Sequence, residues 1–320
     1  MKITDFSNCE YRELSYNDIF VCALGYESRS HYLLLRNIET RDSSNTLIIF
    51  FNDLDKSSLP STILQRIEIK QIHCVTCSYE EGEKADDVIV EFIDKSTQNN
   101  TDKKIHIDYS SMTRTWYCNL PQRIECAPFA ANVELFFWYV AGEYPDIYES
   151  YPTAGIDCLS IFHGGVLPMI DCQRTHIIAL SYDAIRTESI LSIVEPEYLV
   201  VCYASNAADA SKKDEVEYIN KDIIRRAAVS VVLPVDNFVF MLSKLNEIIH
   251  EQTTNGQVIL IPDGPKPIIF VMSLISLLVD IEDAVTCLHV KRNQNISNNK
   301  ISVIARKNEI FGVKLVFKVE

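Results

Sequence analysis

Short apolar runs alternate with amphipathic segments along most of the chain. The segment Ile19–Arg29 begins with such a run, rich in β-branched and aromatic residues, as in strands that are buried on both faces of a sheet. In Asp86–Lys95 and Asn237–His250, apolar residues recur every three or four positions, which predicts helices. Strands that alternate with helices favour parallel sheets built from right-handed βαβ units.

The two halves of the chain repeat the same order of elements. IFVCALGYESR at Ile19–Arg29 resembles HIIALSYDAIR at His176–Arg186, with an Ala-Leu pair and a Tyr-acidic pair in matching places. The strands expected after these segments are Asn45–Asp53, Ile69–Cys77, Lys104–Arg114 and Val133–Val140 in the first half, and Glu197–Ser205, Ala227–Val235, Gln257–Lys266 and Ala284–Lys291 in the second.

This repetition predicts an α/β fold of two tandem Rossmann-like three-layer units related by internal duplication. We expect a pseudo-dimer with a shared cleft, and two independent domains are the alternative. The expected divisions are a first unit over 1–145, a linker or insert over 146–174 and a second unit over 175–320. The tail Ile301–Val319 alternates in polarity around Lys-Asn-Glu, which predicts a C-terminal β-hairpin, and a weaker counterpart is expected within Ile156–Met169.

The composition is that of an ordinary globular protein, and its charge limits the class of ligand. Among 320 residues, 47% are hydrophobic and 23% are charged, which excludes a disordered chain, collagen or a coiled coil. The formal net charge of −14 disfavours duplex nucleic acid as a partner, but a few local cations can still hold a small anion.

Several other classes of protein lack support in the sequence. There is no secretory leader and no apolar run long enough for a bilayer, so we expect a cytoplasmic protein with no membrane partner. We expect no metal site, because Cys74-x-x-Cys77 has no second ligand pair, and no cofactor. Neither GxGxxG nor GxxxxGK[ST] occurs, which argues against dinucleotide binding and a P-loop.

Two loops per half follow strands at the positions where open parallel sheets bind ligands. The first loop is Gly25-Tyr26-Glu27-Ser28-Arg29. The second, Asp108–Arg114, offers small hydroxyl side chains and backbone amides at a helix start, and Arg114 can grip a phosphate with two hydrogen bonds. A simple Ser/Thr helix cap with a solvated arginine is the alternative. The second half places Pro262–Pro267, with the cation Lys266, at the corresponding point.

The turns DYSSMTRT and PDGPKP, each between a strand and a helix, resemble the signature turn of CRISPR-associated Rossmann-fold (CARF) domains. The resemblance extends to the related two-unit SAVED sensors of bacterial antiphage systems. It implies paired units that bind a cyclic oligonucleotide across their interface. This sequence also departs from the family's pattern. Met112 stands where the family has a small residue, Arg114 replaces the usual lysine, and the second turn has no hydroxyl. Two unlike half-sites favour an asymmetric or linear nucleotide, or a single working half.

The resemblance also assigns roles to individual residues. The expected ligand contacts are Ser110, Ser111, Thr113 and Arg114 in the first half and Gly264 and Lys266 in the second. The first-strand loop adds Gly25 and Arg29, and the paired Tyr26 and Tyr182 either stack on bases or plug the space between helix and sheet. Glu27, Asp108 and Arg114 are the candidates for catalysis, because carboxylates beside a phosphate serve a hydrolase. Their alternative is a structural role at a helix start and a strand end.

Three functions remain open at this point. The leading one is a binder or sensor of a nucleotide or (cyclic) oligonucleotide in prokaryotic antiviral defence, with the ligand held between the units and the output passed to an effector protein. The second is an enzyme that cleaves or cyclises a nucleotide phosphodiester, like the ring nucleases among stand-alone CARF proteins. The third is a scaffold subunit of a defence complex that binds no ligand.

Overall fold

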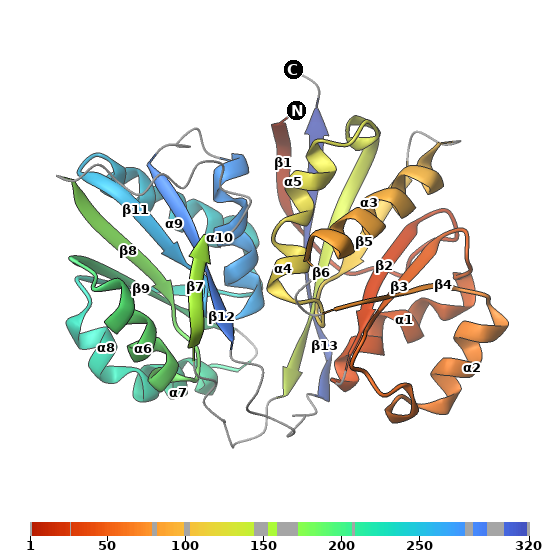
Figure 1. Ribbon diagram of the computed structural model, residues 1–320, viewed down its shortest axis with the longest axis horizontal. Coiled ribbons are helices and arrows are strands. Elements are labelled where there is room, and N and C mark those ends of the chain that lie inside the picture. The colour runs from red at the N-terminus through yellow and green to blue at the C-terminus, as the bar shows by residue number, and fades with distance from the viewer. Residues whose placement is uncertain are drawn as a thin grey trace. The chain divides into compact units, whose positions relative to one another are not determined.

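The computed structural model describes residues 2–25, 27–78, 82–98, 103–143, 153–158, 172–206, 209–278, 284–292 and 304–318. The chain divides into two compact units, and each contains one sheet with helices beside it (Figure 1). The first unit comprises Met1–Pro145 and Asn299–Glu320, and the second comprises Asp146–Asn298. The predicted α/β class with two Rossmann-like units is confirmed.

The first unit contains a seven-stranded sheet in the order β1-β13-β6-β5-β2-β3-β4. Strands β2 to β6 are parallel, while β13 is antiparallel to both β6 and β1. Helices α3, α4 and α5 lie on one side of the sheet and α1 on the other (Figure 1). The elements are β1 (Lys2–Cys9), β2 (Ile19–Leu24), α1 (Tyr32–Asn37), β3 (Thr46–Phe51), α2 (Ser61–Ile69), β4 (His73–Cys77), α3 (Gly82–Thr97), β5 (Lys103–Asp108), α4 (Arg114–Tyr117), α5 (Leu120–Glu125), β6 (Val133–Glu143) and β13 (Ile304–Lys318).

The second unit contains a six-stranded sheet in the order β10-β9-β8-β11-β12-β7. Strands β8 to β12 are parallel and β7 is antiparallel to β12. Helices α6, α7 and α8 share one apolar cluster with the sheet, and α9 packs against α10. The elements are β7 (Thr153–Cys158), β8 (Gln173–Ala179), α6 (Ala184–Val194), β9 (Tyr198–Ser205), α7 (Ser211–Ile219), α8 (Lys221–Arg226), β10 (Val229–Pro234), α9 (Phe238–Thr253), β11 (Gly256–Ile261), α10 (Lys266–Leu278) and β12 (Val285–Arg292).

The sequence repeat is visible in the sheets. The order β4-β3-β2-β5-β6 in the first unit corresponds strand for strand to β10-β9-β8-β11-β12 in the second. The repeated segments of the sequence form β2 and β8, which are central strands in both sheets. All six residues of β2 are buried, because helices cover both faces of a parallel sheet and leave no place for the polar half of an alternating pattern.

The antiparallel strands are exchanged between the repeats. Strand β7 follows β6 in the chain but pairs with β12 of the second unit, while β13 follows β12 but pairs with β6 of the first. The prediction of a C-terminal hairpin is wrong, because β13 is a single strand. The Lys-Asn-Glu segment, expected to form the turn, lies within this strand at a register shift between Ala305 and Ile310. This last segment lies in the first unit, where the sequence placed it in the second. The segment expected to be a linker contributes β7, and the described part of the expected hairpin there is a single strand, since residues 159–171 lie outside the described ones.

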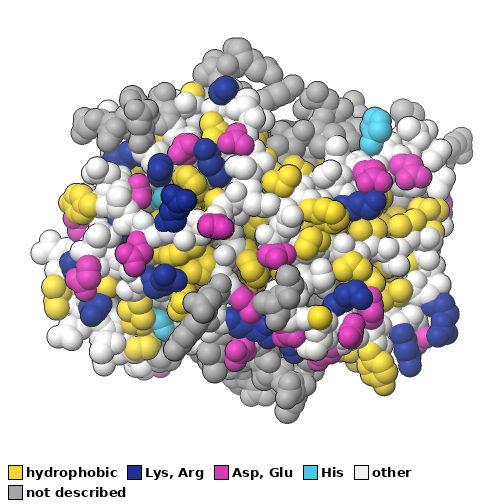
Figure 2. Space-filling view, turned by 180° about the vertical axis from the view of Figure 1, so that it is seen from behind, with side chains coloured by type: hydrophobic (Ala, Val, Ile, Leu, Met, Phe, Trp, Pro, Cys, Tyr) yellow, Lys and Arg dark blue, Asp and Glu magenta, His cyan; other side chains and the backbone are white. Residues whose placement is uncertain are grey.

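Charged side chains of both signs are interspersed over the face shown in Figure 2. A negatively charged ligand therefore depends on local cations and backbone amides, as the net charge of −14 indicated. Among the residues that the structure describes, no helix combines the length and the apolar character needed to cross a bilayer.

Candidate functional site

Both sheets contain the strand-order reversal at which open parallel sheets bind ligands. In the first unit β2 lies between β3 and β5, and in the second β8 lies between β9 and β11. The chain runs from β2 to β3 on one side and from the adjacent β5 to β6 on the other, and it does the same at β8 and β11 in the second unit. The loops that follow these two adjacent strands therefore separate at this point. The loops singled out in the sequence are those after β2 and β5 and those after β8 and β11.

In the first unit the two loops approach each other closely. A Cβ atom at Gly25 would lie 3.2 Å from Phe51 Cε2 and 3.8 Å from Ser111 Cβ, so the glycine lets the backbone after β2 approach the turn after β5. Phe51 in turn stacks on Trp116 with their ring centroids 4.7 Å apart. Tyr26 lies outside the described residues, and its stacking role stays a prediction.

Arg29 ties the first loop to strand β6. It lies in a short 3-10 helix, Ser28–His31, and only 1% of the residue is exposed. Its Nε donates to Glu27 Oε2 at 2.5 Å, and its Nη1 donates to Tyr139 Oη at 2.9 Å and to Val140 O at 3.3 Å. Its Cζ lies 5.3 Å from the centroid of the Tyr139 ring. The guanidinium is thus fixed in direction by partners from two parts of the chain.

The turn after β5 is anchored on the same residue of β6. Asp108 Oδ1 accepts hydrogen bonds from Ser110 N at 3.0 Å and from Ser110 Oγ at 2.5 Å. The Ser110 hydroxyl oxygen accepts in turn from Val140 N at 2.8 Å. Because Asp108 and Ser110 are both buried, these contacts give them a structural role in shaping the turn. This is the structural alternative to the catalytic and ligand-binding roles expected from the sequence.

The outer part of the turn offers Ser111, Thr113 and Arg114. Ser111 and Arg114 are partly exposed. The Ser111 hydroxyl oxygen is itself buried and has no hydrogen-bond partner within the described residues. Thr113 occupies the N-cap of α4, but its hydroxyl contacts Thr115 Oγ1 at 2.8 Å and caps no backbone amide. Since α4 has only four residues, its dipole is small, and Arg114 is the main positive charge of the turn.

Aromatic side chains support this turn from beneath. The Tyr109 ring centroid lies 5.1 Å from that of Tyr117 and 5.7 Å from that of Tyr139. Tyr109 N donates to Trp138 O at 3.1 Å, which extends the contact between the turn and β6. Burial raises the pKa of Tyr109 well above its ordinary value, so its phenol is neutral. The packing makes the turn a rigid base for the partly exposed residues.

The second unit contains a parallel arginine with a different partner. Arg186 corresponds to Arg29, and its Nη2 donates to Val290 O on β12 at 3.3 Å, just as Arg29 donates to Val140 O on β6. Its Nε, however, donates to both carboxylate oxygens of Asp263, at 2.9 and 3.1 Å. Both side chains of this ion pair are buried. The negative charge of Asp263 is therefore paired with Arg186 in the protein interior.

The remaining predicted residues of the second unit lie at the same edge of the sheet. A Cβ at Gly264 would lie 2.8 Å from Ala179 Cβ and 3.0 Å from Leu180 O, so glycine is required for close packing of the turn on β8. Lys266 is partly exposed as the first residue of α10. Tyr182 packs against the apolar cluster, with Lys212 Nζ 5.9 Å from its ring centroid. These contacts favour the plug over the base-stacking platform for Tyr182.

Comparison with known proteins finds a likeness in fold alone. No family model and no curated protein sequence matches the chain. A solved structure, described as that of a Type III CRISPR defence DNA nuclease activated by cyclic oligoadenylate, resembles it with a TM-score of 0.50 and 8% sequence identity. The match covers 84% of this chain and 65% of the nuclease. This chain shares its fold with a CRISPR defence protein.

That likeness agrees with the predicted α/β fold. The way in which Arg29 and Ser110 brace the turns was not predicted from the sequence, although one indication was available. Arg29 and Arg186 occupy matching places in the repeat, which indicates a packing role that both units share. Their strand partners Val140 and Val290 contribute only backbone carbonyls, which no side-chain pattern reveals.

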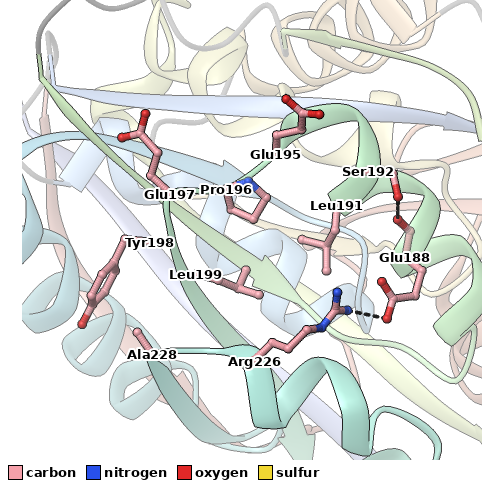
Figure 3. Close-up of a pocket in the computed structure, with 10 residues that line it drawn as sticks. All are labelled: Glu188, Leu191, Ser192, Glu195, Pro196, Glu197, Tyr198, Leu199, Arg226 and Ala228. Atoms are coloured by element: carbon pink, nitrogen blue, oxygen red, sulfur yellow. Dashed lines mark hydrogen bonds and ion pairs between the residues drawn. The ribbon is translucent and has the colours of Figure 1, made fainter.

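A separate hollow in the second unit lies at the opposite end of the strands (Figure 3). It has a volume of about 450 Å³ and includes Tyr198, the first residue of β9. Arg226 contacts Glu188 there, and Glu195 and Glu197 add two further carboxylates. This acidic lining does not suit a phosphate. Within the described part of the chain, no three His, Cys, Asp or Glu side chains are grouped to hold a metal ion.

Proposed function

We propose that this protein binds a nucleotide or small oligonucleotide, cyclic or linear, as a sensor in prokaryotic antiviral defence. The fold is shared with a nuclease described as activated by cyclic oligoadenylate, which makes an oligoadenylate the first ligand to test. The ligand would contact the turn after β5, the turn after β11, or both, and an effector protein would receive the signal.

The observation that carries the proposal is a pair of corresponding turns, each with a partly exposed cation at the start of the next helix. Arg114 begins α4 after β5, and Lys266 begins α10 after β11. Both turns lie where strand order reverses. The buried hydroxyl oxygen of Ser111, which has no hydrogen-bond partner among the described residues, adds a polar group that a phosphate oxygen or its water would satisfy.

Binding without cleavage is the better supported form of the proposal. Asp108 is buried and accepts two hydrogen bonds from Ser110, and Glu27 is paired with Arg29. A buried carboxylate held like that of Asp108 is poorly placed to activate a nucleophile, because a general base must reach the proton that it removes. Catalytic roles for Glu27, Asp108 and Arg114 therefore become the alternative that the assay below also detects.

The test measures binding and turnover together. The full chain is titrated with cyclic and linear oligoadenylates by calorimetry and thermal shift, and the mixtures are then analysed for cleaved products. Arg114→Ala should weaken binding about tenfold to a hundredfold, because it removes a charge-assisted hydrogen bond to phosphate. Arg66→Ala is the control, since Arg66 is an exposed arginine of the same unit that is paired with Glu39. The expected loss is confined to the Arg114 variant.

Lys266→Ala tests whether the second unit takes part. If the ligand bridges both units, this substitution also weakens binding, whereas a single working half leaves the affinity unchanged. New products in the mixtures would support the cleaving enzyme over the sensor. An absence of binding to every oligonucleotide, or full binding by the Arg114 variant, would reject the proposed site.

A further inference from the structure

The two corresponding arginines differ in the carboxylate that neutralises them. Arg186 is held by Asp263, whose side chain is 0% exposed. Arg29 is held by Glu27, whose side chain is 30% exposed, although the Arg29 side chain itself is only 1% exposed. The two guanidinium groups share one further contact, since each donates to the backbone of the neighbouring strand. The difference therefore lies in whether the counter-ion can leave.

Glu27 is free to leave in a way that Asp263 is not. Glu27 lies in the loop after β2, and its carboxylate can turn into solvent without opening the core. The Asp263 side chain is 0% exposed and accepts from Arg186 Nε with both oxygens, so moving it would separate a buried ion pair. Arg29 keeps its orientation when Glu27 moves, because Tyr139 and Val140 hold Nη1.

We propose that the Glu27 carboxylate occupies a phosphate subsite on Arg29 and is displaced when a phosphate-bearing ligand binds. A phosphate oxygen would take the place of Glu27 Oε2, 2.5 Å from Arg29 Nε. That the phosphate belongs to a nucleotide rests on the proposed function, whereas the exchange of anions rests on this geometry alone. Glu27 then acts as an internal competitor that raises the ligand concentration needed for occupancy.

Exchange of Glu27 for a phosphate keeps the positive charge of Arg29 neutralised. A guanidinium that is almost fully buried needs an anion beside it at all times, and replacing one oxyanion by another keeps it neutralised. The cost of binding is the work of moving Glu27 away, and the observed affinity equals the intrinsic affinity multiplied by the fraction of molecules in which Glu27 has moved. The second unit lacks such an exchange, which agrees with unequal half-sites.

The subsite is tested with inorganic pyrophosphate as the probe. In protein labelled with ¹⁵N-arginine, the side-chain Nε–H signals of Arg29 and Arg186 are assigned with the Arg29→Lys and Arg186→Lys variants. Pyrophosphate should shift the Arg29 signal of the otherwise unchanged protein and leave that of Arg186 in place. Arg186 is thus an internal control with the same neighbouring strand contact.

Affinity measurements on variants give the second readout. Glu27→Gln removes the competing charge while keeping an oxygen that can accept from Arg29 Nε, so pyrophosphate should bind about three- to tenfold more tightly. Glu39→Gln changes the net charge by the same amount at an exposed site and should alter the affinity little. The experiment on the unsubstituted protein remains informative if Glu27→Gln fails to fold.

The outcomes separate the subsite from the proposed function. A still Arg29 signal, or unchanged or weaker binding by a folded Glu27→Gln variant, would overturn the subsite even if oligonucleotides bind elsewhere. A shifted Arg29 signal and tighter binding by the variant would support it. If those effects are seen while no oligonucleotide binds, the proposed function fails and the subsite stands.

Discussion

Replacing Asp263 by Asn should destabilise the second unit strongly, because it removes the negative charge that is paired with the buried Arg186 guanidinium. Arg186 Nε lies 2.9 and 3.1 Å from the two Asp263 oxygens, and the two side chains are 1% and 0% exposed. Removing one partner of a buried pair costs about 3–5 kcal/mol of the free energy of unfolding. Because the asparagine oxygen can still accept one hydrogen bond from Arg186, we expect a cost in the lower half of this range.

A second ion pair on the same helix provides the control. Glu188 of α6 contacts Arg226, but these side chains are 42% and 56% exposed. Solvent screening and side-chain entropy limit an exposed pair to about 1 kcal/mol or less, so Glu188→Gln should be nearly neutral. The double variant Arg186→Met with Asp263→Leu should recover much of the lost stability, because an apolar pair needs no compensation.

The assay must report on the second unit. Both tryptophans, Trp116 and Trp138, lie in the first unit, so their fluorescence does not follow this change directly. Urea unfolding followed by far-ultraviolet circular dichroism, with hydrogen exchange in β8, β11 and β12, measures it instead. If Asp263→Asn costs no more than Glu188→Gln, the Arg186 pair does not hold the turn as argued.

Two further predictions concern packing and pH. Gly312→Ala should destabilise the first unit by about 1–3 kcal/mol, because the new Cβ would lie 2.2 Å from Cζ3 of the buried Trp138; urea unfolding followed by tryptophan fluorescence measures this loss. Burial lowers the pKa of His176 from 6.5 to about 4, so the unfolded chain takes up a proton between these values and the folded state loses up to about 3 kcal/mol as pH falls through that window. The slope of the unfolding free energy against pH should therefore be smaller in His176→Leu.

Matched substitutions make both predictions decisive. Lys318→Ala alters an exposed position of the same strand as Gly312 and should change little, so an equal effect of the two would contradict the packing argument. His73→Gln replaces an exposed histidine of the first unit and is the matched substitution for His176→Leu. An unchanged slope in His176→Leu would show that His176 does not titrate in this window.

The sequence predicted where the two loops lie in the sheet, but not which contacts each of their residues makes. The order of strands and the repeat located the loops after β2 and β5, because carboxyl ends of parallel strands share one edge. Ser110 was expected to face a ligand, yet it is buried against Val140 of β6, some thirty residues later in the chain. Arg29 was expected to be a ligand residue, and its partners Glu27 and Tyr139 show how it is held.

The sequence by itself determined the α/β class, the duplication and the two loops of each unit. Strands of a parallel sheet are buried on both faces, so each appears in the sequence as a continuous apolar run that can be recognised locally. Tertiary structure decided the pairing of β13 with β6 and β1, the place of β7 beside β12, and the partners of Arg29 and Arg186. Alternating polarity predicts that a segment is a strand, but it does not show which other strand it pairs with. That choice depends on packing between segments far apart in sequence, as does the degree to which each arginine's counter-ion is enclosed.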